Sequence, residues 1–332
     1  MKKLLTAGVV ALAAFSLSAC SSKNSDAAKK AYIDDMVALN SKDYNSQDLS
    51  VSVDQFKASG TSSADMNKYL NGSSFDFKVG LDSKNQAASL GGTAKIAGTS
   101  YKLDAIMGKS GIYVSSADVK SLFNSNKAAI SSAAGGAENM QVYNAMIGGL
   151  TTPYFLIDSA TMDSSLKSSN TTWSDTLSNM FKQQQTVSKD DLTKAFKDVP
   201  NADFTQSGDK VTLKLSGKNG DFSDVLKGAA SVNKSISQSD IEKALKQAGT
   251  DTNIESLNLT VTIDSKAHTV SGVLDGKISD KKTKDTIDFK MTLSSKMEKL
   301  TTAITEPTGS QVKTLQDLEN SAMDAFLGQS AS

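Results

Sequence analysis

Apolar and polar residues alternate over several short stretches of the chain. The clearest stretch is 74–82, where apolar side chains occupy every second position: Phe75, Phe77, Val79 and Leu81. A period of two is typical of a strand with one buried face. This pattern, together with a short apolar run at 154–158, predicts strands at 49–57, 87–97, 101–107, 112–114, 154–158, 210–216, 257–263, 268–274 and 286–294.

Helices are predicted where apolar residues recur every three or four positions behind a capping residue. Ser115, Thr172 and Ser188 are candidate N-caps, and Pro200 should end the helix that follows Ser188. Residues 118–150, rich in Ala, Ser, Asn and Gly, are expected to be helical or mobile. The main helices are predicted at 26–39, 62–70, 189–199, 239–248 and 311–327.

These elements predict an α+β fold. Strands with one apolar and one polar face belong to an antiparallel sheet that is wet on one side. We therefore expect a curved antiparallel sheet, a half-open β-barrel, with helices covering its concave face. Residues 26–332 should form a single domain with a helical insert at about 116–200, and turns are expected at Ala97–Gly98 and Asp275–Gly276.

The first twenty residues have the parts of a lipoprotein export signal. Lys2 and Lys3 precede an apolar stretch that is too short for a comfortable membrane span. The sequence Leu17-Ser18-Ala19-Cys20 then resembles a lipobox. We predict a signal peptide at 1–19, cleavage before Cys20, and diacylglyceryl and acyl (palmitate) attachment to its thiol. Residues 20–25 are a short polar tether, and two acyl chains suffice for stable anchoring.

The amino-acid composition excludes some classes of binding partner. The formal net charge is zero, and all 36 cationic side chains are Lys. The lack of Arg argues against nucleic-acid binding and against bidentate phosphate recognition. Cys20 is the sole cysteine, so no disulfide framework and no second thiol exist. We expect a lipid-anchored protein on the extracytoplasmic face of the cell membrane, on the cell surface or in a periplasm according to the envelope of the source.

The layout resembles the LolA/LolB/LppX-like lipoprotein fold, a curved half-barrel that holds helices and, in several members, a lipid. The stretches that carry the resemblance are 75–81, 101–114, 154–158, 257–263 and 287–293. The resemblance implies that the protein binds or carries a lipid or another apolar ligand. The lining it implies is Phe75, Phe77, Leu103, Leu259, Val261, Phe289 and Met291. The same residues suit a dry core, which leaves open a non-enzymatic surface-interaction or envelope-maintenance protein with an unknown protein partner.

Catalytic and metal-binding patterns are missing from the sequence. Zinc sites need about four Cys, His or carboxylate ligands, and His268 is the single histidine. It is expected to be an ordinary strand residue. Ser-x-x-Lys occurs at 164–167 and 231–234 without its partner motifs, and no phosphate loop is present. Cationic residues at 281–284 are expected at a solvated hairpin tip. The sequence therefore predicts no enzyme, no metal and no cofactor.

Overall fold

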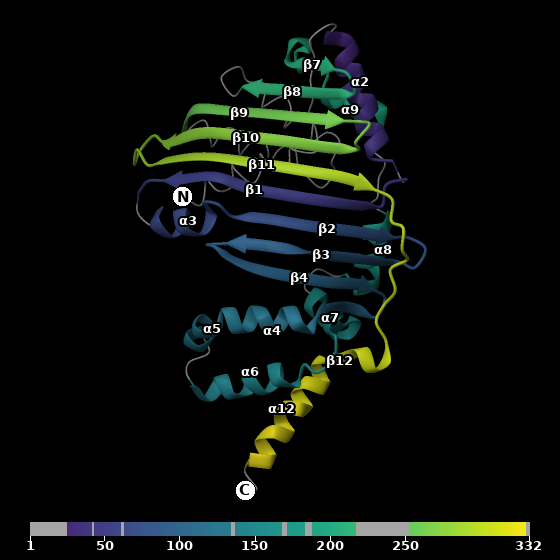
Figure 1. The fold of residues 1–332 in the computed structure, drawn as a ribbon, viewed down its shortest axis with the longest axis vertical. Helices are drawn as coiled ribbons and strands as arrows, with labels where there is room; N and C mark the ends of the chain where they lie inside the picture. Colours follow the sequence, from purple (N-terminus) through teal and green to yellow (C-terminus); the bar gives the residue numbers. More distant parts are fainter. Residues whose placement is uncertain are drawn as a thin grey trace. The chain divides into compact units, whose positions relative to one another are not determined.

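The computed structural model describes residues 25–329 except 42, 61–62, 134–136, 168–170, 183–187 and 217–251 (Figure 1). Its strands form one twelve-stranded sheet in the order β12-β6-β5-β4-β3-β2-β1-β11-β10-β9-β8-β7. The order begins and ends on different strands, so the sheet is not closed. The prediction of an α+β chain with a large, mostly antiparallel, open sheet is confirmed. Helical cover of a concave face stays a prediction.

The strands follow one another closely along the chain. They are β1 (Ser46–Ala58), β2 (Ser74–Asp82), β3 (Ala87–Ile96), β4 (Thr99–Gly108), β5 (Gly111–Ser115), β6 (Tyr154–Asp158), β7 (Phe204–Ser207), β8 (Lys210–Ser216), β9 (Thr252–Asp264), β10 (Thr269–Asp280), β11 (Thr286–Glu298) and β12 (Val312–Thr314). The ten strands predicted from the sequence all lie within these segments, apart from a residue at some ends. Two short strands, β7 and β12, have no counterpart in the sequence prediction.

Helices lie between the strands and at the end of the described residues. They are α2 (Ser25–Leu39), α3 (Ser63–Leu70), α4 (Ser116–Ser125), α5 (Lys127–Ala133), α6 (Ala137–Gly149), α7 (Ser159–Leu166), α8 (Trp173–Lys182), α9 (Lys189–Ala195) and α12 (Leu315–Gln329). Within the described part of the chain, no helix is long and apolar enough to cross a membrane.

The chain divides into two compact units. Unit 1 comprises Met1–Phe75, Ile96–Gly98 and Gln185–Glu298, and unit 2 comprises Asp76–Lys95, Thr99–Gln184 and Lys299–Ser332. Unit 1 therefore contains α2, α3, α9, β1 and β7–β11. Unit 2 contains most of β2, then β3–β6, α4–α8, β12 and α12. The proposed signal peptide, Cys20, the tether up to residue 24 and the predicted helix at 239–248 lie outside the described residues.

Unit 1 has a packed apolar core between α2, α9 and its strands. Figure 1 shows α2 and α9 beside β7 and β8. Tyr32 of α2 contacts the rings of Phe196 and Phe204 edge-on, at centroid distances of 5.2 and 6.3 Å. Fully buried aromatic and aliphatic side chains of this kind dominate core energetics. The largest are Tyr32, Phe196, Phe204, Leu192, Leu213, Leu259, Ile263 and Leu274.

One turn prediction and one strand prediction in unit 1 were wrong. Asp275 and Gly276 lie inside β10, where Gly276 pairs with Leu257 of β9 and Phe289 of β11. A Cβ on Gly276 would stand 3.0 Å from both of those side chains, so glycine makes room for them rather than turning the chain. His268 was predicted within a strand, yet it occupies the β9–β10 turn with φ 55°. Its ring lies 4.9 Å from the ring of Tyr44.

Unit 2 confirms the helix-capping predictions. Ser115 caps α4 by accepting from the backbone N–H of Asp118. Thr172 and Asp175 bond one another at the start of α8. In unit 1, Ser188 caps α9 in the same way. The prediction of a helix at 311–327 was wrong for its first residues. Val312–Thr314 form the strand β12, which pairs in parallel with Tyr154–Leu156 of β6.

Candidate functional site

Four of the seven predicted lining residues lie in the core of unit 1. Leu259 and Val261 are each 1% exposed, and Phe289 is 8% exposed. Met291 packs against the same cluster from β11. These side chains are in contact with the apolar residues of α2, α9 and the neighbouring strands. Among the described residues, this part of the predicted lining is therefore a packed core.

The other three predicted lining residues lie on β2 and β4. Phe75 and Phe77 are half-buried, and Leu103 is 38% exposed. Phe77 and Leu103 belong to unit 2, whereas Phe75 falls at the boundary of unit 1. The structure thus separates the seven residues into a buried set in unit 1 and a half-exposed set on β2 and β4.

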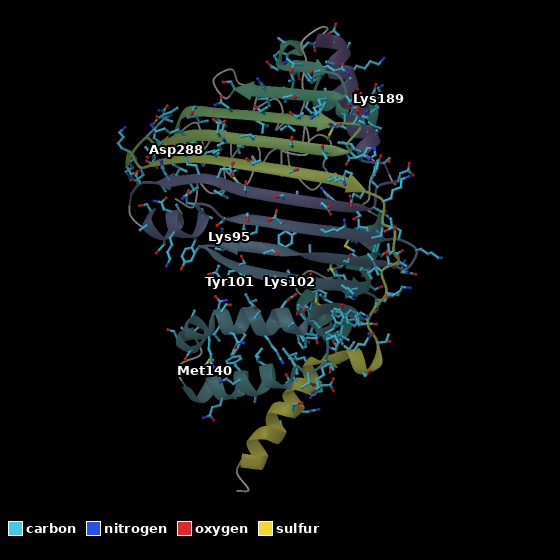
Figure 2. The ribbon with its side chains drawn as sticks, in the orientation of Figure 1. Lys95, Tyr101, Lys102, Met140, Lys189 and Asp288 are labelled. Carbon is cyan, nitrogen blue, oxygen red and sulfur yellow. The ribbon has the colours of Figure 1, made fainter. Side chains whose placement is uncertain are left out.

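Phe77 and Leu103 belong to a larger apolar face in unit 2. We call it the β2–β4 apolar face. Successive side chains on a strand point to opposite faces, so alternate residues share one face. Tyr101 and Lys102, both labelled in Figure 2, are consecutive residues of β4, so their side chains take opposite faces. The face comprises Phe77, Val79 and Leu81 of β2, Leu90 and Gly92 of β3, and Tyr101, Leu103, Ala105 and Met107 of β4.

Most side chains of the β2–β4 apolar face are only half-buried. Apart from Leu103, which is exposed, its residues have intermediate exposure. A Cβ on Gly92 would collide with the backbone and ring of Phe77, which places Gly92 beside Phe77. Glycine at this position lets the Phe77 ring lie close to the sheet. The face is therefore apolar, contiguous across three strands and incompletely covered by the described residues.

The segment 299–308 lies against part of the opposite face, near Gly80 of β2 and Gly108 of β4. Leu300 and Ile304 stand 3.1 and 3.3 Å from where a Cβ of Gly80 would be. Asp82 accepts from the backbone N–H of Lys84 and Asn85, each at 3.1 Å, and from Ile304 at 3.0 Å. The hydrogen bond from Ile304 holds the segment against the end of β2. The two faces of β2 thus differ, because the segment 299–308 packs on one of them and not on the other. We call this segment the strap.

Glu306 holds the same segment to the β4–β5 turn. Its carboxylate accepts from the backbone N–H of Lys109 at 2.7 Å and of Ser110 at 3.2 Å, and from the Tyr113 hydroxyl at 3.0 Å. Burial acts to raise the pKa of Glu306, but these hydrogen bonds outweigh it and hold the pKa below its usual value. Burial, with Glu306 nearby, raises the pKa of Tyr113. The arrangement suits a structural latch.

A small open cavity lies between the end of α7 and the start of α8. It has a volume of about 350 Å³ and is lined by Asp163, Ser164, Lys167, Thr171 and Thr172. Asp163 is engaged in holding α8, because it accepts from the backbone N–H of Trp173 at 2.6 Å. The Trp173 indole N–H in turn donates to the Gly108 carbonyl at 2.8 Å. The Ser-x-x-Lys match at 164–167 therefore lies at the end of α7, where the neighbouring Asp163 holds the start of α8.

Metal ligation finds no support in the described residues. No group of three or more His, Cys, Asp or Glu side chains there could hold a metal ion. The absence of catalysis and of a cofactor stays a prediction. No protein-family model matches the chain, and no curated protein matches it.

Proposed function

We propose that this protein is a membrane-anchored extracytoplasmic lipoprotein that holds a lipid or another apolar ligand on the β2–β4 apolar face. The observation that carries the proposal is the incomplete burial of that face, from Phe77 to the exposed Leu103. A contiguous apolar surface gains free energy when it is removed from water, at about 25 cal/mol per Å². Acylated Cys20 would supply the anchor.

The alternative is a surface-interaction protein with no small ligand. Two observations favour it: Leu259 and Val261 lie in a packed core, and apolar side chains are exposed on four helices. The exposed residues are Tyr69 on α3, Leu122 on α4, Val142 and Tyr143 on α6, and Met323 on α12. Such residues suit contact with another protein. The two candidates differ in which surface binds: the sheet face or the helices.

Native mass spectrometry of the chain from Ser21 onward, followed by organic extraction, tests ligand binding. We expect a stoichiometric lipid, or saturable binding of a fluorescent fatty acid. Leu103→Asp should weaken binding several-fold, since a carboxylate would stand on the apolar face. Leu122→Asp is the matched control, because Leu122 is also an exposed leucine of unit 2 but lies on α4. Equal effects of the two substitutions, or no binding by the parent chain, would contradict the proposal.

Anchoring is tested separately in cells. The mature protein should carry the mass of a diacylglyceryl group on Cys20 and fractionate with membranes. Cys20→Ala should abolish this added mass. A parent protein that lacks the mass would argue against the lipid anchor while leaving ligand binding to be judged by the first experiment.

A further inference from the structure

The proposed anchor lies close in sequence to the first helix of unit 1. Described structure begins at Ser25, the first residue of α2, five residues after Cys20. Five residues span at most about 18 Å even when fully extended. Acyl chains on Cys20 would insert in the bilayer and hold that residue at the membrane surface. The start of α2 must then remain within that distance of the headgroups.

The start of α2 is fixed to the end of α9 and the residues after it. The Lys29 ammonium donates to the carbonyl oxygen of Val199 at 2.7 Å and of Lys197 at 3.5 Å. Asn201 donates to the carboxylate of Asp26. Desolvation by burial lowers the pKa of Lys29, in keeping with its packing at this end. We call this surface, residues 26–30 and 194–203, the proximal end of unit 1.

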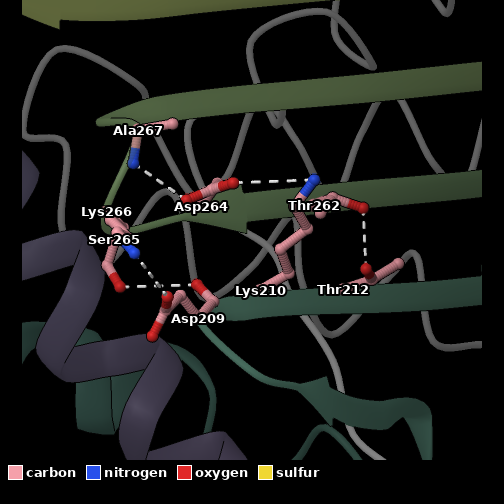
Figure 3. Close-up of polar contacts among 8 residues, drawn as sticks. All are labelled: Asp209, Lys210, Thr212, Thr262, Asp264, Ser265, Lys266 and Ala267. Atoms are coloured by element: carbon pink, nitrogen blue, oxygen red, sulfur yellow. Dashed lines mark hydrogen bonds and ion pairs between the residues drawn. The ribbon is translucent and has the colours of Figure 1, made fainter.

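The other end of α2 meets a different set of residues. Asp34 forms an ion pair with Lys189, which starts α9, so α2 and α9 run antiparallel. Asp35 interacts with Ser265 and Asp209 in the β9–β10 and β7–β8 turns. Figure 3 shows these two turns joined by hydrogen bonds from Ser265 to the Asp209 carbonyl, with α2 passing beside them. Asp35 lies about 14 Å along the helix axis from Asp26.

We infer that the proximal end is the surface of unit 1 that contacts phospholipid headgroups, with the turns around Ser265 directed away from the membrane. The inference rests on acylation of Cys20 in the proposed function and not on ligand binding. The exposed side chains there include Lys30, Lys194 and Lys197. Their ammonium groups sit on flexible stems that reach lipid phosphate oxygens. The tether length, rather than this charge alone, selects the surface.

Lysine footprinting tests the orientation. The chain from Cys20 onward has one thiol, which can be coupled to a maleimide lipid in phosphatidylcholine vesicles. The readout is acylation of Lys197 relative to Lys266, measured by mass spectrometry on coupled and uncoupled protein. The two lysines are well matched, because their side chains are 70% and 83% exposed. Each lies near one aspartate, at 3.5 Å from Asp198 and 4.0 Å from Asp209.

Coupling should lower acylation of Lys197 several-fold while Lys266 keeps its reactivity. Equal labelling of both, or selective protection of Lys266, would overturn the inference. Insertion of about 20 Gly and Ser residues after Ser21 should restore the ratio of the free protein, because such a linker reaches about 25 Å on average. Protection that persists with the long linker would contradict the argument that the tether length selects this surface. The synthetic anchor makes the result independent of whether cells acylate Cys20.

Discussion

The side-chain amide of Asn67 forms two hydrogen bonds with the backbone of Ala58. The Ala58 N–H donates to Oδ1 at 2.6 Å, and Nδ2 donates to the Ala58 carbonyl at 3.0 Å. One helical turn later, Asn71 Oδ1 accepts from the Phe56 N–H at 2.9 Å. The amide of Asn67 thus takes the place of a neighbouring strand. Side chains of and next to helix α3 thus pair the backbone N–H and C=O groups at the end of β1, beyond the point where β2 can pair with them.

Asn67→Ala should therefore destabilise unit 1. Two partly buried backbone groups would lose their partner, which costs about 1–3 kcal/mol in the free energy of unfolding. Urea titration followed by circular dichroism measures the change. Lys68→Ala, at the next and exposed position of α3, should stay within about 0.5 kcal/mol. Equal losses in the two variants would mean that α3, and not the amide, is responsible.

Acid should loosen the strap at Asp82. The hydrogen bond from the Asn85 backbone N–H is the largest cause that lowers the pKa of Asp82. Burial acts to raise this pKa, but the hydrogen bonds from Asn85, Ile304 and Lys84 together outweigh burial. Because the folded pKa lies below the unfolded value of about 3.9, the stabilisation is present above that pH and is lost as pH falls through the folded pKa. Asp82→Asn should flatten the pH dependence of the urea midpoint below about pH 5. An unchanged slope would contradict this assignment.

Gly108→Ala should disturb the Glu306 latch. A Cβ on Gly108 would collide with the Glu306 carboxylate. Displacing that group removes its hydrogen bonds to Lys109, Ser110 and Tyr113, for an expected loss of about 1–3 kcal/mol. Trp173, the single tryptophan, bonds the Gly108 carbonyl, so its fluorescence should shift to the red.

A glycine in α6 provides the comparison for this substitution. A Cβ on Gly148 would meet nothing within 4 Å, and its φ is not positive. Gly148→Ala should leave stability unchanged or raise it by up to about 1 kcal/mol, because alanine favours helix. Similar behaviour of the two variants would show that Glu306 moves aside without cost.

The β3–β4 turn can be improved. Ala97 and Gly98 form its two-residue loop with φ values of 50° and 81°. Both positions favour residues that tolerate positive φ, and Ala97 does not. Ala97→Asn should raise the free energy of unfolding by about 0.5–1 kcal/mol, whereas Ala97→Val should lower it. Thermal unfolding of the three proteins gives the order, and a Val variant as stable as the Asn variant would refute the argument.

The two sets of predicted lining residues should respond differently to truncation. Leu259→Ala removes a side chain that is 1% exposed, which costs about 2–5 kcal/mol through lost burial and a cavity. Leu103→Ala removes one that is 38% exposed and should cost less than about 1 kcal/mol. Urea unfolding of each variant measures the difference. A comparable loss at Leu103 would mean that the β2–β4 apolar face is covered like a core.

Local patterns in the sequence predicted where strands and helices lie. The ranges 74–82, 154–158 and 210–216 coincide with β2, β6 and β8. Period-two alternation is a property of a single strand, and it needs no knowledge of the partner. Ser115 and Ser188 were likewise identifiable as N-caps, since a cap bonds a backbone N–H only two or three residues away.

Contacts between distant segments decided the rest. Val312–Thr314 continue a helical pattern in sequence, yet they become a strand because β6 offers an edge. Asp275–Gly276 read as a turn, yet Gly276 is needed between Leu257 and Phe289. The predicted lining residues lie in stretches with the same alternating pattern. Among the described residues α2 packs onto β7–β9, and Leu259 is buried there whereas Leu103 is exposed. Alternation reports that a face is apolar, but the element that covers it lies far away in the chain.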